Sequence, residues 1–374
     1  MHSTVADHLG QRTNRIDQIR LGAAVAVVFG HSWHLSRGPE AIAPLEHWLG
    51  LGIHELAVHV FFFLSGLLIT QSALRHQGRP LRFAFARLKR IVPALWVHAL
   101  LLLPVLTLLG VATSEDGDAL MAYAARLMSI VFVDFTVPGL FADNPFPEAV
   151  NGSVWSLRHE LIVYGLVGGA GALGALHTRW GVLAFVLFVA IWISAAHLIA
   201  PQATGGLAFI FAEGRWVMAS FLLGVICHRT ARYMALRADI LIGLWGLAAL
   251  ALITLPSILS VHLVLIAICY STLLLAFAGK PECGLSADLS YAIYIYGWPV
   301  QQVVVLACMQ VFGFTPSALV LFGLAMGPLA MIAFASWHWV EQPALKLSFP
   351  VGPKRAGPVL DPALRQSFQD AERR

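Results

Sequence analysis

Apolar segments long enough to cross a lipid bilayer recur along almost the whole of this 374-residue chain. A transmembrane helix needs about 20 consecutive, mostly apolar residues. Ten segments meet this requirement: 17–36, 54–73, 90–111, 153–175, 180–200, 207–227, 240–256, 259–279, 289–312 and 316–340. Only 12% of the residues are charged, whereas a soluble domain carries about 25%. The sequence therefore excludes a soluble globular protein and predicts an all-α polytopic membrane helix bundle of about ten transmembrane helices.

The basic residues gather in the loops on one side of this bundle. Lys and Arg are concentrated before the first segment, between the second and third, and after the sixth. The first and third loops, on the other side, are mainly acidic. Because cytoplasmic loops collect Lys and Arg, both termini are predicted to be cytoplasmic. The net charge of +4 reflects this placement, and no nucleic-acid partner is expected.

The loops divide the chain into three parts. Residues 1–11 are predicted to be a cytoplasmic N-terminal tail and 12–347 one membrane domain. Residues 348–374 are rich in Pro, Gly and charge, which predicts a disordered cytoplasmic tail. The longest loop, about 112–152, falls on the extracytoplasmic side. Loops of this length are usually functional, so we expect a partly ordered cap over an outward cavity.

The four cysteines show no CxxC spacing, and they lie at positions 227, 269, 283 and 308. Three of them fall in apolar segments, where a thiol packs as a small apolar group. We expect no disulfide framework and no metal site.

Ionisable residues inside membrane segments are costly and therefore mark candidate sites. In the first segment, Arg20 lies at the predicted cytoplasmic end and His31 lies deeper, eleven positions further on. At about 100° and 1.5 Å per residue, the two side chains share one helix face and lie about 16 Å apart. Arg20 alone could be an anchor to lipid headgroups, and His31 alone a satisfied core histidine. Their pairing on one face favours a functional role for both.

Two further strings carry charge into the predicted membrane region. Arg87 and Arg90 lie on one helix face, where paired guanidinium groups bind phosphate oxygens. The alternative is a charge cluster that only sets topology. Arg158 and Glu160 lie in the outer half of the fourth segment. Glu160 could orient a catalytic imidazole or accept from a sugar hydroxyl with Arg158 neutralising it, or the two could be a structural pair.

Five strings in order resemble the motifs of the acyltransferase 3 family of integral membrane enzymes. The strings, with the family motifs to which they are similar, are Arg20 with His31 (Arg-x10-His), 61–67 (FFxxSGF), 87–90 (RxxR before Ile-x-Pro), 155–164 (WSLxxExxxY) and 290–299 (SYxxYxxHxP). One departure is Gly297, which stands where the family usually has a histidine and puts a second catalytic histidine in doubt. The chain also lacks the SGNH domain of some relatives, so transfer would finish in the membrane domain or pass to a separate partner.

The resemblance implies an acyl-CoA-dependent O-acyltransferase of a bacterial cytoplasmic membrane. The co-substrate would be acyl-CoA, most simply acetyl-CoA, with no permanently bound cofactor and no metal. Its binding residues would be Arg20, Ser65, Arg87 and Arg90. His31 would act as general base or brief acyl carrier with Glu160 as a second catalytic residue. The acceptor would be an extracytoplasmic or lipid-linked glycan, such as an exopolysaccharide or O-antigen, and would lie near Trp155, Arg158 and Tyr164.

Two other functions fit the same residues. One is a proton-coupled transporter of an anionic solute, with His31 and Glu160 as proton relay and the arginines as substrate site. No internal repeat of the transporter kind is visible in the sequence. The other is a non-catalytic binding subunit, for which Gly297 is the only indication. The acceptor sugar, the acyl chain and the oligomeric state are not predicted.

Overall fold

The computed structural model describes residues 3–9, 14–113, 115–202, 206–277 and 285–349, with the backbone alone for 206–213 and 258. This part of the chain is helical and contains no strand, only two isolated β-bridges. Ten long helices coincide with the ten predicted segments: α2 (Ile16–Arg37), α4 (Ile53–Arg75), α5 (Pro80–Leu108), α7 (Trp155–Ala172), α8 (Arg179–Ile199), α9 (Gly206–Thr230), α10 (Ala238–Thr254), α11 (Ser257–Phe277), α12 (Ser290–Phe312) and α13 (Ala318–Ser336). The predicted all-α fold is confirmed.

Six helical stretches of the described chain are long and apolar enough to cross a membrane. They are Ile53–Arg75, Pro80–Leu108, Arg179–Gln202, Leu259–Phe277, Ser290–Phe312 and Ala318–Lys346. Of the other four long helices, α10 is shorter, and α2, α7 and α9 carry more polar and charged residues. Ten crossings and cytoplasmic termini therefore stay predictions.

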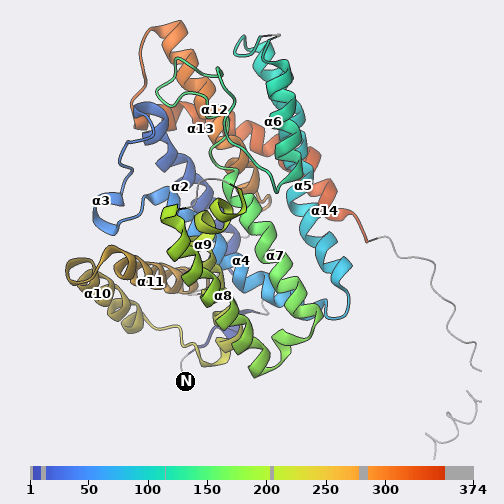
Figure 1. Cartoon of the computed structure of the whole chain (residues 1–374), viewed down its shortest axis with the longest axis vertical. Coiled ribbons are helices and arrows are strands. Elements are labelled where there is room, and N and C mark those ends of the chain that lie inside the picture. Colours follow the sequence, from blue (N-terminus) through green and yellow to red (C-terminus); the bar gives the residue numbers. More distant parts are fainter. Residues whose placement is uncertain (1–2, 10–13, 114, 203–205, 278–284, 350–374) are drawn as a thin grey trace, which may run out of the picture.

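The centre of the bundle is formed by α2, α4, α9 and α12 (Figure 1). α2 packs against α4 and α12, while α4 packs against α9. A Cβ atom on Gly66 of α4 would lie 2.1 Å from the carbonyl oxygen of Phe221, and one on Gly224 of α9 would lie 2.2 Å from that of Phe63. These two glycines therefore allow the closest approach of α4 and α9, the role predicted for the small residues of the second segment.

The long loop between α5 and α7 is partly ordered, and it contains a helix that the search for apolar segments did not predict. This helix, α6 (Gly117–Ser129), packs against α5 through the buried side chains of Leu120, Tyr123 and Leu127 (Figure 1). Further along the loop, the Asn144 side chain donates to the backbone oxygen of Gln302 at 3.0 Å. The loop is thereby fixed to α12.

The short helices and the chain ends complete the fold. They are α1 (Ala6–Leu9), α3 (Glu46–Leu49) and α14 (Gln342–Lys346). Of the predicted N-terminal tail, 3–9 pack on the segment after α9, where the Val5 N–H donates to the Met234 oxygen at 3.0 Å. Cys227, Cys269 and Cys308 are buried free thiols. Cys283 and most of the predicted C-terminal tail, 350–374, lie outside the described residues.

Candidate active site

Two adjoining cavities lie in the centre of the bundle. The arginine cavity has a volume of about 100 Å³, and its polar lining residues are Arg20, Ser65, Arg87, Arg90, Ser156, Glu160, Tyr164, Ser290, Tyr291 and Tyr294. The histidine cavity has a volume of about 520 Å³ and is lined chiefly by His31, His34, His54, Glu55, His59, Trp155, Arg215, Trp216 and Trp298. Val58 and Tyr294 line both cavities. The cavities therefore meet at these two side chains.

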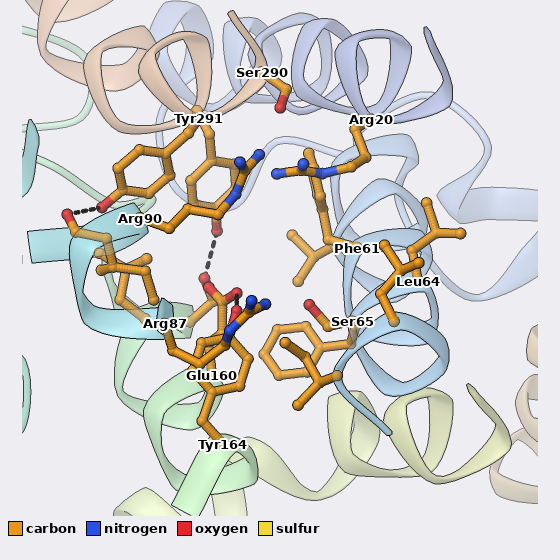
Figure 2. Close-up of a pocket in the computed structure, with 18 residues that line it drawn as sticks. Arg20, Phe61, Leu64, Ser65, Arg87, Arg90, Glu160, Tyr164, Ser290 and Tyr291 are labelled. Carbon is orange, nitrogen blue, oxygen red and sulfur yellow. Dashed lines mark hydrogen bonds between the residues drawn. The ribbon is translucent and has the colours of Figure 1, made fainter. Parts of the chain in front are cut away.

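Three guanidinium groups from two helices point into the arginine cavity (Figure 2). Arg20 comes from α2, and Arg87 and Arg90 come from α5, one turn apart on the same face. The Nη1 atom of Arg20 lies 3.0 Å from Oδ2 of Asp288, and Arg90 forms an ion pair with the same oxygen. One carboxylate thus holds two guanidinium groups side by side.

Asp288 lies just before α12 and was not predicted as a site residue. Its other oxygen, Oδ1, accepts a hydrogen bond from Ser290 Oγ at 2.5 Å. Burial disfavours the charged carboxylate, but Arg20 and Arg90, together with the Ser290 hydroxyl, outweigh this effect and hold the pKa of Asp288 well below its ordinary value. The carboxylate is therefore ionised at neutral pH, and the arginine cavity is built around a bound anionic group.

Glu160 lies in the arginine cavity rather than beside His31, as the predicted imidazole-orienting role would require. The Tyr164 hydroxyl donates to its carboxylate from one turn further along α7. Residues four apart on a helix share a face, which is why the two line one cavity. Figure 2 shows Glu160 facing the space into which Arg87 and Ser65 also point. All four residues predicted to bind the donor meet here together with Glu160 and Tyr164.

The three residues predicted to bind the acceptor are separated in space. Trp155 lines the histidine cavity and Tyr164 lines the arginine cavity. Arg158 lines a third, apolar groove between α7 and α8, together with Leu161 and Leu166 of α7. Successive helix positions turn by about 100°, so Arg158 and Glu160 point to nearly opposite sides of α7. The expected common site for these residues is therefore wrong.

His31 is buried at the histidine cavity, with two other histidines close to it. Its ring centroid lies 5.2 Å from that of His54 and 4.8 Å from that of Trp298. The His34 ring lies 5.0 Å from the His54 ring. The indole N–H of Trp298 donates to the Ala149 oxygen at 2.8 Å, which fixes this ring over His31. The cavity combines imidazole groups with flat aromatic faces.

The two ends of the predicted stripe on α2 open into different cavities. Arg20 lines the arginine cavity and His31 the histidine cavity, about 16 Å apart along the helix. Tyr294, at the junction, is fixed because its hydroxyl bonds Ser156 Oγ at 2.6 Å and donates to the Ser153 oxygen at 2.9 Å. A molecule held at Arg20 would have to pass Val58 and Tyr294 to reach His31.

Sequence reasoning missed His34, His54 and Asp288. His34 and His54 fall at or near segments predicted to cross the membrane, so the criterion that selected His31 could have selected them. Asp288 precedes its segment by one position and carries no comparable signal. At Gly297, an added Cβ would lie 2.6 Å from Val28 Cγ2. A histidine at this position would therefore enter the packing of α12 on α2.

The described residues include no group of three or more His, Cys, Asp or Glu side chains that could hold a metal ion. Their chemistry consists instead of an anion-binding cluster of guanidinium groups and a buried imidazole cluster. Guanidinium groups bind phosphates through fork-shaped pairs of hydrogen bonds. A neutral imidazole can take a proton from a hydroxyl group.

Comparisons with known proteins give one family and two relatives. A family model described as an acyltransferase domain, acyltransferase 3, matches residues 13–338. An O-acetyl transferase of Shigella phage Sf6 is 28% identical to the chain, and the alignment covers 91% of this chain and 98% of the relative. Nodulation protein 10 of Rhizobium leguminosarum bv. viciae is 27% identical, with 91% and 95% covered. No solved structure matches the chain.

Proposed function

The chain belongs to the acyltransferase 3 family, and on this premise we propose that it moves an acyl group from cytoplasmic acyl-CoA to a hydroxyl of an extracytoplasmic or lipid-linked glycan. Acetyl is the simplest acyl group, in keeping with the similarity to an O-acetyl transferase. An exopolysaccharide or an O-antigen is the type of acceptor that we favour. The observation that carries the proposal is the junction of an arginine cavity with a histidine cavity.

In this proposal the arginine cavity binds the phosphate groups of acyl-CoA. Arg20 and Arg90 exchange Asp288 for a phosphate, or share it, and Arg87 supplies a third guanidinium group. Ser65 adds a hydroxyl at the same cavity. Glu160 and Tyr164, which are hydrogen-bonded to each other, position Arg87 and limit the net positive charge of the empty site. The acyl-CoA is a co-substrate and leaves as CoA.

The pantetheine arm would run from the arginine cavity past Val58 and Tyr294, which brings the thioester to His31. The distance of about 16 Å along α2 is of the order of an extended pantetheine arm. His31 takes the proton of the acceptor hydroxyl as its oxygen attacks the thioester carbonyl carbon. The C–S bond breaks, and the proton passes to the leaving sulfur. In the alternative course, the His31 ring carries the acyl group between two such steps.

The acceptor glycan would enter the histidine cavity from the side of the loop at 112–152. Trp155 and Trp298 offer flat faces on which a sugar ring can stack. Arg158, in the groove between α7 and α8, would contact the lipid-linked part of such an acceptor rather than its sugar. The groove is otherwise apolar and suits a hydrocarbon chain.

We further propose ten membrane crossings in a bacterial cytoplasmic membrane, with both termini and the arginine cavity on the cytoplasmic side. The basic loop that leads into α5 lies next to that cavity, because Arg87 and Arg90 of α5 line it. The cap formed by the loop at 112–152 is fixed near the histidine cavity through Phe146, which lines it. The transporter alternative uses the same arginines, but the family match favours acyl transfer.

The test is O-acylation of the surface glycan in cells that carry the wild type or His31→Ala at matched membrane levels. Mass spectrometry would detect the added acyl mass, and acetyl-CoA consumption by membrane vesicles would identify the donor. We expect the mass with the wild type and none with His31→Ala. Equal acylation by both would refute the role of His31. Uptake of an anionic solute without release of CoA would instead support the transporter.

A further inference from the structure

Two neighbouring buried imidazole nitrogens at the histidine cavity have no hydrogen-bond partner among the described residues. They are Nδ1 of His31 and Nδ1 of His54. Nearly all buried polar groups in proteins are hydrogen-bonded, so each exception requires an explanation. The two rings have centroids 5.2 Å apart and planes inclined by 54°. A small rotation of either ring, or one bridging water, would connect the two nitrogens and satisfy both.

The position of His54 depends on two glycines. A Cβ atom on Gly30 of α2 would lie 2.7 Å from the Cβ of His54, and one on Gly52 would lie 2.6 Å from its Cε1. Any larger residue at either position would displace the imidazole. The start of α4 is fixed as well, because the Gly52 N–H donates to the Glu55 carboxylate at 2.7 Å. The backbone therefore holds the His54 ring against α2, next to His31.

Other neighbours of His31 are committed elsewhere. The Trp298 indole N–H donates to the Ala149 oxygen. His34 contacts the His54 ring rather than the His31 ring, and its Nδ1 lies 3.3 Å from the Pro39 oxygen. His54 is therefore the described polar group best placed to bond Nδ1 of His31.

We propose that His54 is the positioning residue for His31. This inference rests on the proposed function, in which His31 accepts the hydroxyl proton. Nδ1–H of His31 donates to the lone pair on Nδ1 of His54, which leaves the lone pair of His31 on Nε2. The Nε2 atom takes the proton of the acceptor hydroxyl and returns it to the sulfur of CoA, so His54 gains and loses no proton. Fixing the tautomer of a catalytic imidazole through its other nitrogen is the general task of such a partner.

The decisive comparison is between His54→Asn and His54→Gln. The side-chain amide of Asn occupies the position of Nδ1 and can keep the hydrogen bond to His31, whereas that of Gln falls near the position of Nε2. Both substitutions are polar and similar in size, and His47→Asn, an exposed change in α3, is the matched control. The assay is acetyl-CoA turnover by membrane vesicles from cells whose glycan is acylated, with kcat and KM measured separately.

We expect His54→Gln to lower kcat about tenfold with KM for acetyl-CoA unchanged, the loss of one buried hydrogen bond. His54→Asn and His47→Asn should stay near the wild-type kcat. Equal activity of the Asn and Gln variants would overturn the proposal, and so would an effect confined to KM. If His31→Ala is inactive while every His54 variant is fully active, only this inference fails and the proposed function stands.

A second measurement does not depend on turnover. Thermal unfolding of the purified protein is measured for His31→Ala, His54→Gln and the double variant. A hydrogen bond between the two rings predicts that the double variant is less destabilised than the sum of the single ones. Additive effects would show that the rings do not interact and would refute the hydrogen bond, even if no acyl transfer were detected.

Discussion

Replacing Asp288 by asparagine should destabilise the empty protein and strengthen the binding of CoA. Asp288 is the carboxylate between Arg20 and Arg90, 3.0 Å from the former and ion-paired with the latter. Its side chain is 14% exposed, and those of Arg20 and Arg90 are 19% and 28% exposed. Removing one partner of a buried ion pair costs about 3–5 kcal/mol. Because the arginines keep some contact with water, we expect about 3 kcal/mol, the lower end of this range.

CoA should offset much of this loss. In the wild type a phosphate group competes with Asp288 for the guanidinium groups, whereas in Asp288→Asn both groups are free to bind it. The variant should therefore unfold at a lower temperature than the wild type without ligand and show the larger increase with saturating CoA, since a ligand stabilises the state that binds it.

The assay is thermal unfolding of the detergent-solubilised protein with and without CoA, together with the Kd for CoA. Asp239→Asn is the control, because it breaks the exposed ion pair with Arg237 and should change little. An unchanged unfolding temperature in Asp288→Asn would refute the structural role of the network. Weaker CoA binding by this variant would refute the competition between carboxylate and phosphate.

The effect of this substitution should not vary between about pH 5 and 8. The folded protein lowers the pKa of Asp288, so the stabilisation by the carboxylate is complete above its ordinary pKa of about 3.9. It is lost only as the pH falls through the lowered value of the folded state. A stability difference that shrinks already between about pH 8 and 5 would contradict the ion pair, as measured by thermal unfolding at each pH.

Three further substitutions test the packing and the route between the cavities. Gly297→His should lower the unfolding temperature and the membrane level without raising activity, because its Cβ would lie 2.6 Å from Val28; higher acyl transfer would refute this. Gly66→Ala should destabilise the protein, since its Cβ would lie 2.1 Å from a backbone oxygen of α9, whereas Gly169→Ala meets nothing within 4 Å and should be neutral in the same unfolding assay. Val58→Phe should leave CoA binding intact but reduce acyl transfer at least about tenfold by narrowing the junction of the cavities; unchanged transfer would exclude this route.

The proposed separation of donor and acceptor sites has a physical reason. A charged nucleotide cannot cross the apolar interior of a membrane, since charged groups there are costly. The arginine cavity would hold that part on one side while a thin arm carries the acyl group to His31. The acceptor would meet only the thioester, in a cavity where little water competes with its hydroxyl.

The sequence by itself determined the helices of this protein. Each of the ten predicted segments is a helix, because a long apolar run in a membrane must satisfy its backbone hydrogen bonds internally. It also determined that Arg20 and His31 share one face of α2, since helix geometry alone relates the two positions. The helix α6 escaped because it is short and amphipathic, and the search used long apolar runs.

Only the tertiary structure decided how the site is divided. Glu160 was expected beside His31 but lies with the arginines, and Arg158 lies in a separate groove. The orientation of α7 about its axis relative to α2, α5 and α8 settles this, and a sequence fixes the faces of one helix but not which neighbour each face meets. Asp288 and His54 became visible for the same reason. Their partners are on other helices, hundreds of residues away for Arg20 and Asp288, and such contacts arise only when the helices pack.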